Sequence, residues 1–127
     1  MLLDTTDLLG KPYKAHARGP MSYDCYGLVI EVERRLGHTM PDLYTRLINC
    51  DQWEIDPHNI DFASEMTGMR KTDIPSFGDV IVFFKKGRVY HTAVYLNEGD
   101  YIQCNRDGVN INNLKYNRDK YEVYKWK

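Results

Sequence analysis

The sequence predicts a single α+β domain in which one helix packs against an antiparallel sheet. The chain has 127 residues, which is enough for one packed core and too few for two. Apolar residues recur every three or four positions from 23 to 36, which is the period of a helix. From residue 80 onward they form runs and alternations separated by turns, as in strands. A helix followed by several closely spaced strands is typical of the α+β class.

The N-terminal residues predict a short helix that lies over the core. Leucines form an amphipathic pattern between residues 2 and 9, and Gly10 and Pro12 would end the helix. Residues 11–22 are predicted to form a loop, because proline and glycine interrupt any regular pattern there.

The clearest helix is predicted over residues 23–36, and Gly37 would close it at the C′ position. Its apolar face comprises Cys25, Leu28, Val29, Val32 and Leu36, while Glu31, Glu33, Arg34 and Arg35 fall largely on the other face. A thiol in the first turn meets the positive end of the helix dipole and unpaired backbone N–H groups, which favour the thiolate. Cys25 is therefore a candidate nucleophile.

Residues 38–75 carry weaker signals. Proline, glycine and asparagine interrupt the segment, and only residues 43–48 and 59–66 predict short helices. A poorly patterned stretch of this length in a compact domain indicates a functional surface loop rather than a linker.

The C-terminal half predicts an antiparallel meander packed on the helix. Its predicted strands are residues 80–84, 89–96, 101–104, 109–111 and 121–126. Residues 85–88 form a turn that joins the first two strands into a hairpin.

Composition excludes several classes of partner. The formal net charge is -1 with acidic and basic residues interspersed, so no basic face for nucleic acid is expected. No run of eighteen apolar residues is present, so no membrane span is expected. The first ten residues lack the pattern of a secretory signal, so we expect synthesis in the cytoplasm.

The chain has three cysteines, Cys25, Cys50 and Cys104, and no CxxC pair. A disulfide framework is therefore not expected, and an odd number leaves at least one thiol without an intramolecular disulfide partner.

His91 lies near the start of the strand predicted at 89–96, and its chemistry complements that of Cys25. Side chains alternate along a strand, so His91, Ala93 and Tyr95 would share one face. We expect this face to pack on the first turn of the helix, because the small Ala93 leaves room for the helix terminus. The thiol and the imidazole would then meet.

Gln103 follows His91 by twelve positions, on the next predicted strand. An odd connecting loop would pair Gln103 with Tyr95 and keep it on the His91 face, whereas an even loop would place it opposite Val94 on the other face. We expect the odd loop or an equivalent bulge. The side-chain carbonyl of Gln103 would then accept the Nδ1 proton of His91 and leave Nε2 facing the sulfur.

Four separated blocks of the sequence closely resemble the NlpC/P60 cysteine peptidases. The blocks are residues 12–13 with 24–29, residues 77–83, residues 91–96 and residues 101–103. The resemblance covers nearly the whole chain, and residues 1–127 are expected to form one domain. It implies a papain-like core with the nucleophile helix packed on an antiparallel β-meander. Members of the family commonly cut the peptide stems of bacterial cell wall, typically at γ-D-glutamyl to diamino-acid bonds.

The resemblance also implies roles for individual residues. Cys25 would be the nucleophile, His91 the general base and Gln103 the third polar residue. Tyr13 would place its hydroxyl near the oxyanion, and Asp24 would help to hold the amino group of the substrate. No cofactor or metal is implied, and the expected partner is a peptidoglycan stem peptide.

Each role has a structural alternative. For Asp24 the alternative, equally predicted, is to cap the helix. For Tyr13 the alternative is to fill the core. Cys50 and Cys104 are predicted to be small buried hydrophobic residues. A zinc site built from these two cysteines with Cys25 and His91 is less favoured, because it lacks the closely spaced ligand pairs of such sites.

Three positions depart from the family pattern. Tyr26 replaces the usual serine, which narrows the site or alters contacts with the substrate. His16 and Ala17 replace two glycines in the loop before the cysteine. Gln103 stands where histidine is most common, and a neutral amide can still fix the imidazole tautomer.

Several segments look most like the phage-tail branch of the family. They are residues 10–13, 18–20 and 40–42, and their presence without a signal peptide predicts association with a prophage or phage particle. Tail-like proteins would then be partners. Two other functions are compatible with the same residues: a catalytically weak assembly component of such a particle, and an amidase or acyltransferase with the same dyad.

Overall fold

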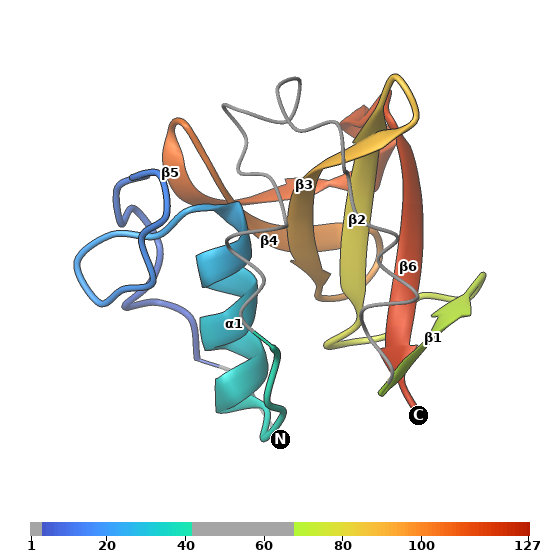
Figure 1. Ribbon diagram of the computed structural model, residues 1–127, viewed down its shortest axis with the longest axis horizontal. Helices are drawn as coiled ribbons and strands as arrows, with labels where there is room; N and C mark the ends of the chain where they lie inside the picture. The colour runs from blue at the N-terminus through green and yellow to red at the C-terminus, as the bar shows by residue number, and fades with distance from the viewer. Residues whose placement is uncertain (1–3, 42–67) are drawn as a thin grey trace.

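The computed structural model describes residues 4–41 and 68–127, and it confirms the α+β class. Its helix α1 (Cys25–Arg35) packs against β3 and β4 of a six-stranded antiparallel sheet with the order β1-β6-β2-β3-β4-β5 (Figure 1). The strands are β1 (Met69–Thr72), β2 (Val80–Lys85), β3 (Arg88–Tyr95), β4 (Asp100–Asn105), β5 (Gly108–Asn113) and β6 (Lys120–Trp126). A 3₁₀ turn, Leu114–Tyr116, separates β5 from β6.

The sequence prediction for α1 is confirmed, including its end. The N–H of Gly37 donates to the carbonyl of Arg34, and the N–H of His38 donates to the carbonyl of Glu33. Together these bonds form a Schellman motif, with Gly37 at a φ of 89°. The helix begins two residues later than predicted, because Tyr23 forms bridges with Tyr13 and Arg18 in extended backbone.

The predicted N-terminal helix is wrong for the residues that the structure describes. The chain turns over residues 6–10 instead, and Leu8 is buried whereas Leu9 is exposed. The N–H of Gly10 donates to the carbonyl of Val109, so this segment is bonded to β5. A helix this short gains too few hydrogen bonds to form on its own, and tertiary contacts decide its conformation. The helices predicted at 43–48 and 59–66 lie outside the described residues.

The four strands β2, β3, β4 and β5 form the predicted meander. Lys86 and Gly87, with φ of 52° and 75°, make the tight hairpin turn between the first two. The last strand differs from the prediction, because β6 pairs with β2 and β1 rather than with β5. Strand β1 was not predicted, since only Met69 of its four residues is buried and no alternation marks it.

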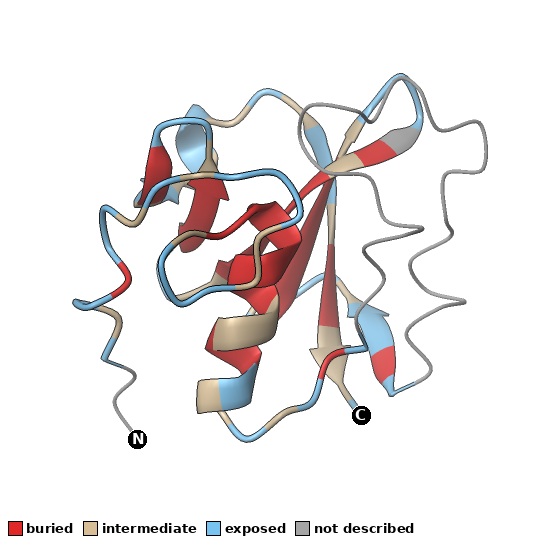
Figure 2. Ribbon diagram, turned by 60° about the vertical axis from the view of Figure 1, so that its left-hand side comes forward, coloured by how far each residue is buried: buried red, intermediate tan, exposed pale blue. Residues whose placement is uncertain are grey.

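Both faces of the sheet are covered by apolar residues. One cluster lies between the sheet and α1 and includes Val80, Val82, Val94 and Ile102. A second cluster lies on the other face and comprises Ile81, Phe83, Ala93, Tyr101 and Val123. This arrangement explains the uninterrupted apolar run of β2, which is buried on both faces. Figure 2 shows the buried residues concentrated where α1 meets the sheet.

Candidate active site

The loop before α1 holds Cys25 at the first position of the helix, where the residue is only 1% exposed. The N–H of Asp24 donates to the carbonyl of Ala17, which lays this loop against the first turn. A Cβ at Gly27 would lie 2.2 Å from the same carbonyl oxygen, so the approach requires glycine there. Cys25 is therefore buried at the junction of this loop and α1.

Asp24 fixes this junction through three hydrogen bonds, and its predicted role as the helix cap is confirmed. Its carboxylate accepts from the N–H of Gly27 at 2.6 Å and from the N–H of His16 at 3.1 Å. It also forms an ion pair with Arg18 at 2.7 Å, a partner that the sequence pattern does not predict. Contact between Asp24 and the amino group of a substrate stays a prediction, and it would have to replace one of these bonds.

His16 occupies a backbone conformation that favours glycine. Its φ is 65°, in the left-handed region, and its N–H points to Asp24. This geometry explains why the departure from glycine at this position is conformationally demanding, yet the loop still reaches Asp24.

The structure joins His91 of β3 to Gln103 of β4. The His91 Nε2 atom lies 2.8 Å from the Gln103 Oε1 atom, and the two residues are 6% and 5% exposed. The imidazole pairs with the amide oxygen as predicted, but through Nε2 and not through Nδ1. Because Nε2 faces Gln103, Nδ1 is the ring nitrogen that remains for a second partner.

The face of the sheet that meets α1 also differs from the prediction. Helix α1 packs with Val94 and Ile102, whereas Ala93 belongs to the cluster on the opposite face. The ring of His91 lies 5.4 Å from that of Phe83, which belongs to the same opposite cluster. The expectation that the face with Ala93 packs on α1 is wrong, because both faces of the sheet are apolar and burial alone did not distinguish them. Contact between the Cys25 thiol and the His91 imidazole stays a prediction.

The strand register keeps Gln103 on the His91 face, although its predicted pairing with Tyr95 is wrong. Tyr95 pairs with Tyr101, and Val94 pairs with Ile102. These are the two pairs that β3 and β4 share, and His91 and Gln103 both lie beyond them. The register between β2 and β3 shifts next to His91, because Phe83 pairs with His91 whereas Phe84 pairs with Val89, which leaves one extra residue in β3.

The start of α1 is attached to β4 beside Gln103. The Cys104 Sγ atom donates to the carbonyl of Tyr23 at 3.2 Å. Burial raises the pKa of the Cys104 thiol to about 12, so this thiol stays protonated near neutral pH. The prediction that Cys104 is a small buried residue is confirmed. Cys50 lies outside the described residues.

Two tyrosines of the predicted site pack near the same junction. Tyr13 forms a bridge with Tyr23, and its hydroxyl oxygen is buried. Tyr26 is 2% exposed, and its hydroxyl donates to the carbonyl of Pro41 while Arg18 lies over its ring. The roles of Tyr13 at an oxyanion and of Tyr26 at a substrate stay predictions.

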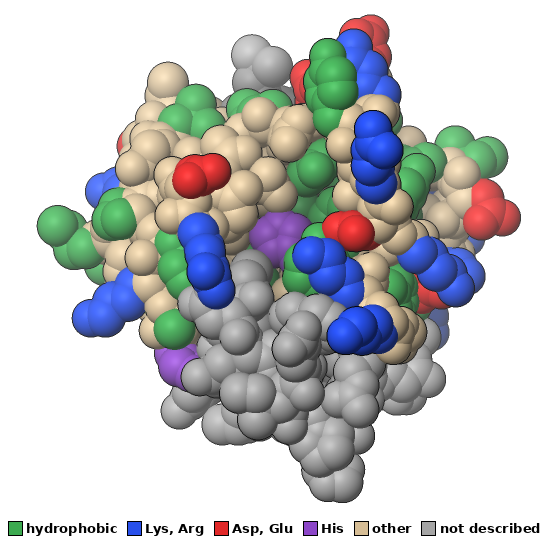
Figure 3. Space-filling view, turned by 90° about the horizontal axis from the view of Figure 1, so that it is seen from above, with side chains coloured by type: hydrophobic (Ala, Val, Ile, Leu, Met, Phe, Trp, Pro, Cys, Tyr) green, Lys and Arg blue, Asp and Glu red, His purple; other side chains and the backbone are tan. Residues whose placement is uncertain are grey.

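The end of the molecule at which α1 begins is the upper end in Figure 1. Figure 3 looks onto this end and shows a histidine side chain recessed among polar and backbone atoms. No three histidine, cysteine, aspartate or glutamate side chains gather into a metal-binding group within residues 4–41 and 68–127. Within the same part of the chain, no helix is both long and apolar enough to cross a membrane.

Comparison with known proteins assigns the family. The model of the NlpC/P60 family matches residues 10–125 of the chain. A curated relative, the "Probable endopeptidase p60" of Listeria grayi, is 25% identical over 113 residues. That match includes 86% of this chain but only 18% of the relative, so the chain spans less than a fifth of the length of that protein.

Solved structures show the same fold at lower identity. NlpC2 from Trichomonas vaginalis superposes with a TM-score of 0.66 at 20% identity, over 94% of this chain and 43% of that one. The NlpC/P60 domain of the peptidoglycan hydrolase SagA superposes with a TM-score of 0.59 at 16% identity, over 95% of this chain and 98% of that one. Because the family model matches most of the sequence, this chain belongs to the NlpC/P60 family.

Proposed function

We propose that this chain is a cysteine peptidase that hydrolyses the stem peptides of peptidoglycan, at the bond between a γ-D-glutamyl residue and a diamino acid. The observation that carries the proposal is the buried hydrogen bond between His91 and Gln103, beside the point at which the start of α1 is bonded to β4. Membership of the family, the name of the Listeria relative and the description of SagA as a peptidoglycan hydrolase support the same reaction class.

In the proposed mechanism the thiolate of Cys25 attacks the carbonyl carbon of the scissile bond. The N–H groups at the start of α1 and the hydroxyl of Tyr13 stabilise the resulting oxyanion. His91 protonates the leaving amine, which gives an acyl-enzyme, and then accepts a proton from the water that hydrolyses it. The amide oxygen of Gln103 accepts a hydrogen bond from Nε2–H of His91, so Nδ1 is the nitrogen that carries out these transfers.

Digestion of purified muropeptides by the Cys25→Ala variant, followed by mass spectrometry, tests this proposal. We expect turnover to fall by roughly 10⁴-fold or more, because the nucleophile is lost, while circular dichroism shows an unchanged fold. The matched control is Cys104→Ser, which removes a thiol but keeps a donor for the carbonyl of Tyr23 and should retain turnover.

The outcome is read from the rate and from the products. Retained turnover by Cys25→Ala would remove this residue from the mechanism. Products with new termini at any other bond would overturn the proposed substrate. Membership of the phage-tail branch and assembly with tail-like proteins stay predictions, since the family match and the relatives described above do not distinguish branches of the family.

A further inference from the structure

We propose that Asn110 of β5 is a positioning residue, which fixes the direction of the Gln103 amide and through it the tautomer of His91. The consequence for catalysis rests on the proposed function, whereas the tautomer itself does not. The inference follows from one continuous set of hydrogen bonds that joins two backbone groups to the imidazole.

Two backbone groups fix the orientation of the asparagine side chains. The Asn110 Nδ2 atom lies 2.9 Å from the carbonyl oxygen of Gly108, which can only accept. The same nitrogen lies 3.0 Å from the Asn105 Oδ1 atom. That oxygen also accepts from the N–H of Asp107, which can only donate. The amide nitrogen of Asn110 therefore faces residues 105–108, and its oxygen faces Gln103.

The orientation passes from Asn110 to Gln103 and then to His91. The Gln103 Nε2 atom donates to the Asn110 Oδ1 atom at 3.0 Å. The amide oxygen of Gln103 is therefore the atom that faces His91 Nε2, at 2.8 Å. Because an amide oxygen only accepts, His91 must carry its proton on Nε2, and in the neutral ring Nδ1 has the lone pair.

Burial raises the free-energy cost of reversing the Gln103 amide. Gln103 and His91 are both buried, and Asn110 is partly buried. Reversal of the Gln103 amide would place two oxygens together at Asn110, which costs free energy where water is not available to replace the lost bonds. Without Asn110 this constraint disappears, since a glutamine amide presents either its oxygen or its nitrogen to an imidazole equally well.

The consequence for the proposed reaction concerns which nitrogen can act as the base. A reversed Gln103 would donate to Nε2, so the proton of the neutral ring would move to Nδ1. The lone pair would then lie on Nε2, facing Gln103, and Nδ1 would carry a proton and could not act as the base in the proposed reaction. An imidazole in the wrong tautomer is a poor general base even when its position is unchanged.

The tautomer can be measured directly on the whole chain with ¹⁵N-labelled histidine. Long-range ¹H–¹⁵N correlation spectra distinguish protonated from unprotonated ring nitrogens, and a His91→Gln variant identifies the signals of this residue. The Cys25→Ala background removes the thiol as a proton donor, and the spectra are recorded at alkaline pH. We expect Nε2–H as the sole form with Asn110 present and a mixture of both forms in Asn110→Leu.

Two matched variants separate the bond to Gln103 from other effects. Asn110→Asp keeps an acceptor for the Gln103 amide and loses the two donors, so it should retain the Nε2–H form. Asn112→Leu makes the same change at an exposed position of the same strand and should also retain it. Nδ1–H as the main form with Asn110 present, or Nε2–H as the sole form in Asn110→Leu, would overturn the proposal.

With Cys25 present, kinetics supply a second readout. We expect Asn110→Leu to lower kcat by roughly 10- to 100-fold with KM little changed, the range seen when a partner that orients a functional histidine is removed. An equal loss in Asn112→Leu would contradict the assignment. An unmodified chain that hydrolyses no muropeptide would count against the proposed function alone, because the tautomer measurement does not need turnover.

Discussion

Asp24 is the residue that determines where α1 begins and how the loop before it is held. Its carboxylate is buried, and it accepts from two backbone N–H groups and from Arg18. A buried carboxylate needs such partners, because its desolvation is otherwise not compensated. The three interactions together therefore stabilise the charged side chain. The sequence predicted the cap, because aspartate before an apolar helical pattern is a common start signal. It could not predict Arg18 or His16, since their contacts depend on the path of the loop.

The two described cysteines are expected to differ in reactivity. Cys104 stays protonated near neutral pH, because burial raises the pKa of its thiol to about 12 and its S–H donates to backbone. Cys25 at the start of a helix is placed where the thiolate is favoured. Iodoacetamide at about pH 6 should therefore modify Cys25 well before Cys104, as peptide mass spectrometry would show.

Labelling of the unfolded protein is the control for this experiment. Cys104 should become modified when the protein is unfolded in urea, because unfolding breaks its bond to the Tyr23 carbonyl and removes the burial that raises its pKa. Equal labelling of both residues in the native protein would argue for an inert scaffold rather than a thiol peptidase.

At the scale of elements, the close packing of α1 and the preceding loop depends on Gly27. This glycine is buried in the first turn, and the carbonyl of Ala17 occupies the space that a side chain would need. A glycine in a helix ordinarily costs about 1 kcal/mol relative to alanine. Its presence here is explained by the contact and not by helix propensity.

Gly27→Ala is expected to destabilise the protein by about 2 to 4 kcal/mol, despite the better helix propensity of alanine. The added methyl group would lie 2.2 Å from the Ala17 oxygen, so the loop or the helix must move. Urea denaturation measures the change. Gly37→Ala is the control: it meets no neighbouring atom and pays only for the left-handed conformation at φ 89°, about 1 to 2 kcal/mol. A smaller loss at Gly27 than at Gly37 would contradict the steric explanation.

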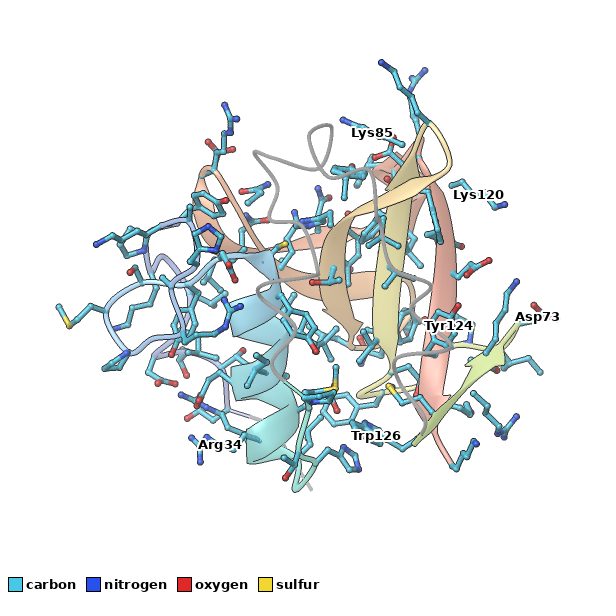
Figure 4. All side chains as sticks on the ribbon, viewed as in Figure 1. Arg34, Asp73, Lys85, Lys120, Tyr124 and Trp126 are labelled. Atoms are coloured by element: carbon cyan, nitrogen blue, oxygen red, sulfur yellow. The ribbon has the colours of Figure 1, made fainter. Side chains whose placement is uncertain are left out.

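At the scale of the whole molecule, Glu33 connects the end of α1 to the C-terminal strand. The sequence placed Glu33 largely on the polar face, which was wrong, because the side chain is 0% exposed. Its Oε1 atom accepts from Trp126 Nε1 at 2.9 Å and contacts His38 Nδ1 at 3.0 Å. The rings of His38 and Trp126 stack at 4.6 Å. Figure 4 shows Trp126 at the end of β6, next to the lower end of α1.

This buried carboxyl predicts a pH dependence of stability. Burial raises the pKa of Glu33 above its usual 4.5, with a smaller contribution from Asp79 and an opposing one from His38 and Trp126. The folded state therefore binds this proton more tightly than the unfolded state. Its contribution to stability is complete below about pH 4.5 and is lost as pH rises through the raised pKa. Glu33→Gln should become progressively more stable relative to the native sequence as pH rises above about 4.5.

Glu31 on the same helix supplies a control of opposite sign. Arg34 and then Arg35 lower the pKa of Glu31, so its contribution is present above the unfolded pKa and is lost as pH falls through the lowered value. Glu31→Gln should therefore lose stability at neutral pH, by less than about 1 kcal/mol for a partly exposed pair, and the loss should fade in acid. Urea titrations at several pH values measure both variants. Parallel pH profiles for the two would contradict this account.

Much of the fold and of the candidate site was predictable from local pattern. The helical period, its glycine end and the hairpin turn each depend on a few neighbouring residues, and the structure has all three. The pairing of His91 with Gln103 was predictable because strand alternation fixes which side chains share a face.

Only the tertiary structure decided the remaining features, because each depends on residues far apart in the sequence. The position of β6 between β1 and β2, the sheet face that meets α1 and the nitrogen of His91 that meets Gln103 all belong to this group. The sequence by itself determined the elements and the chemistry of the candidate residues, through periodicity and residue type. The assembled sheet determined their orientation, because a side chain takes its direction from the partners that burial and hydrogen bonding bring to it.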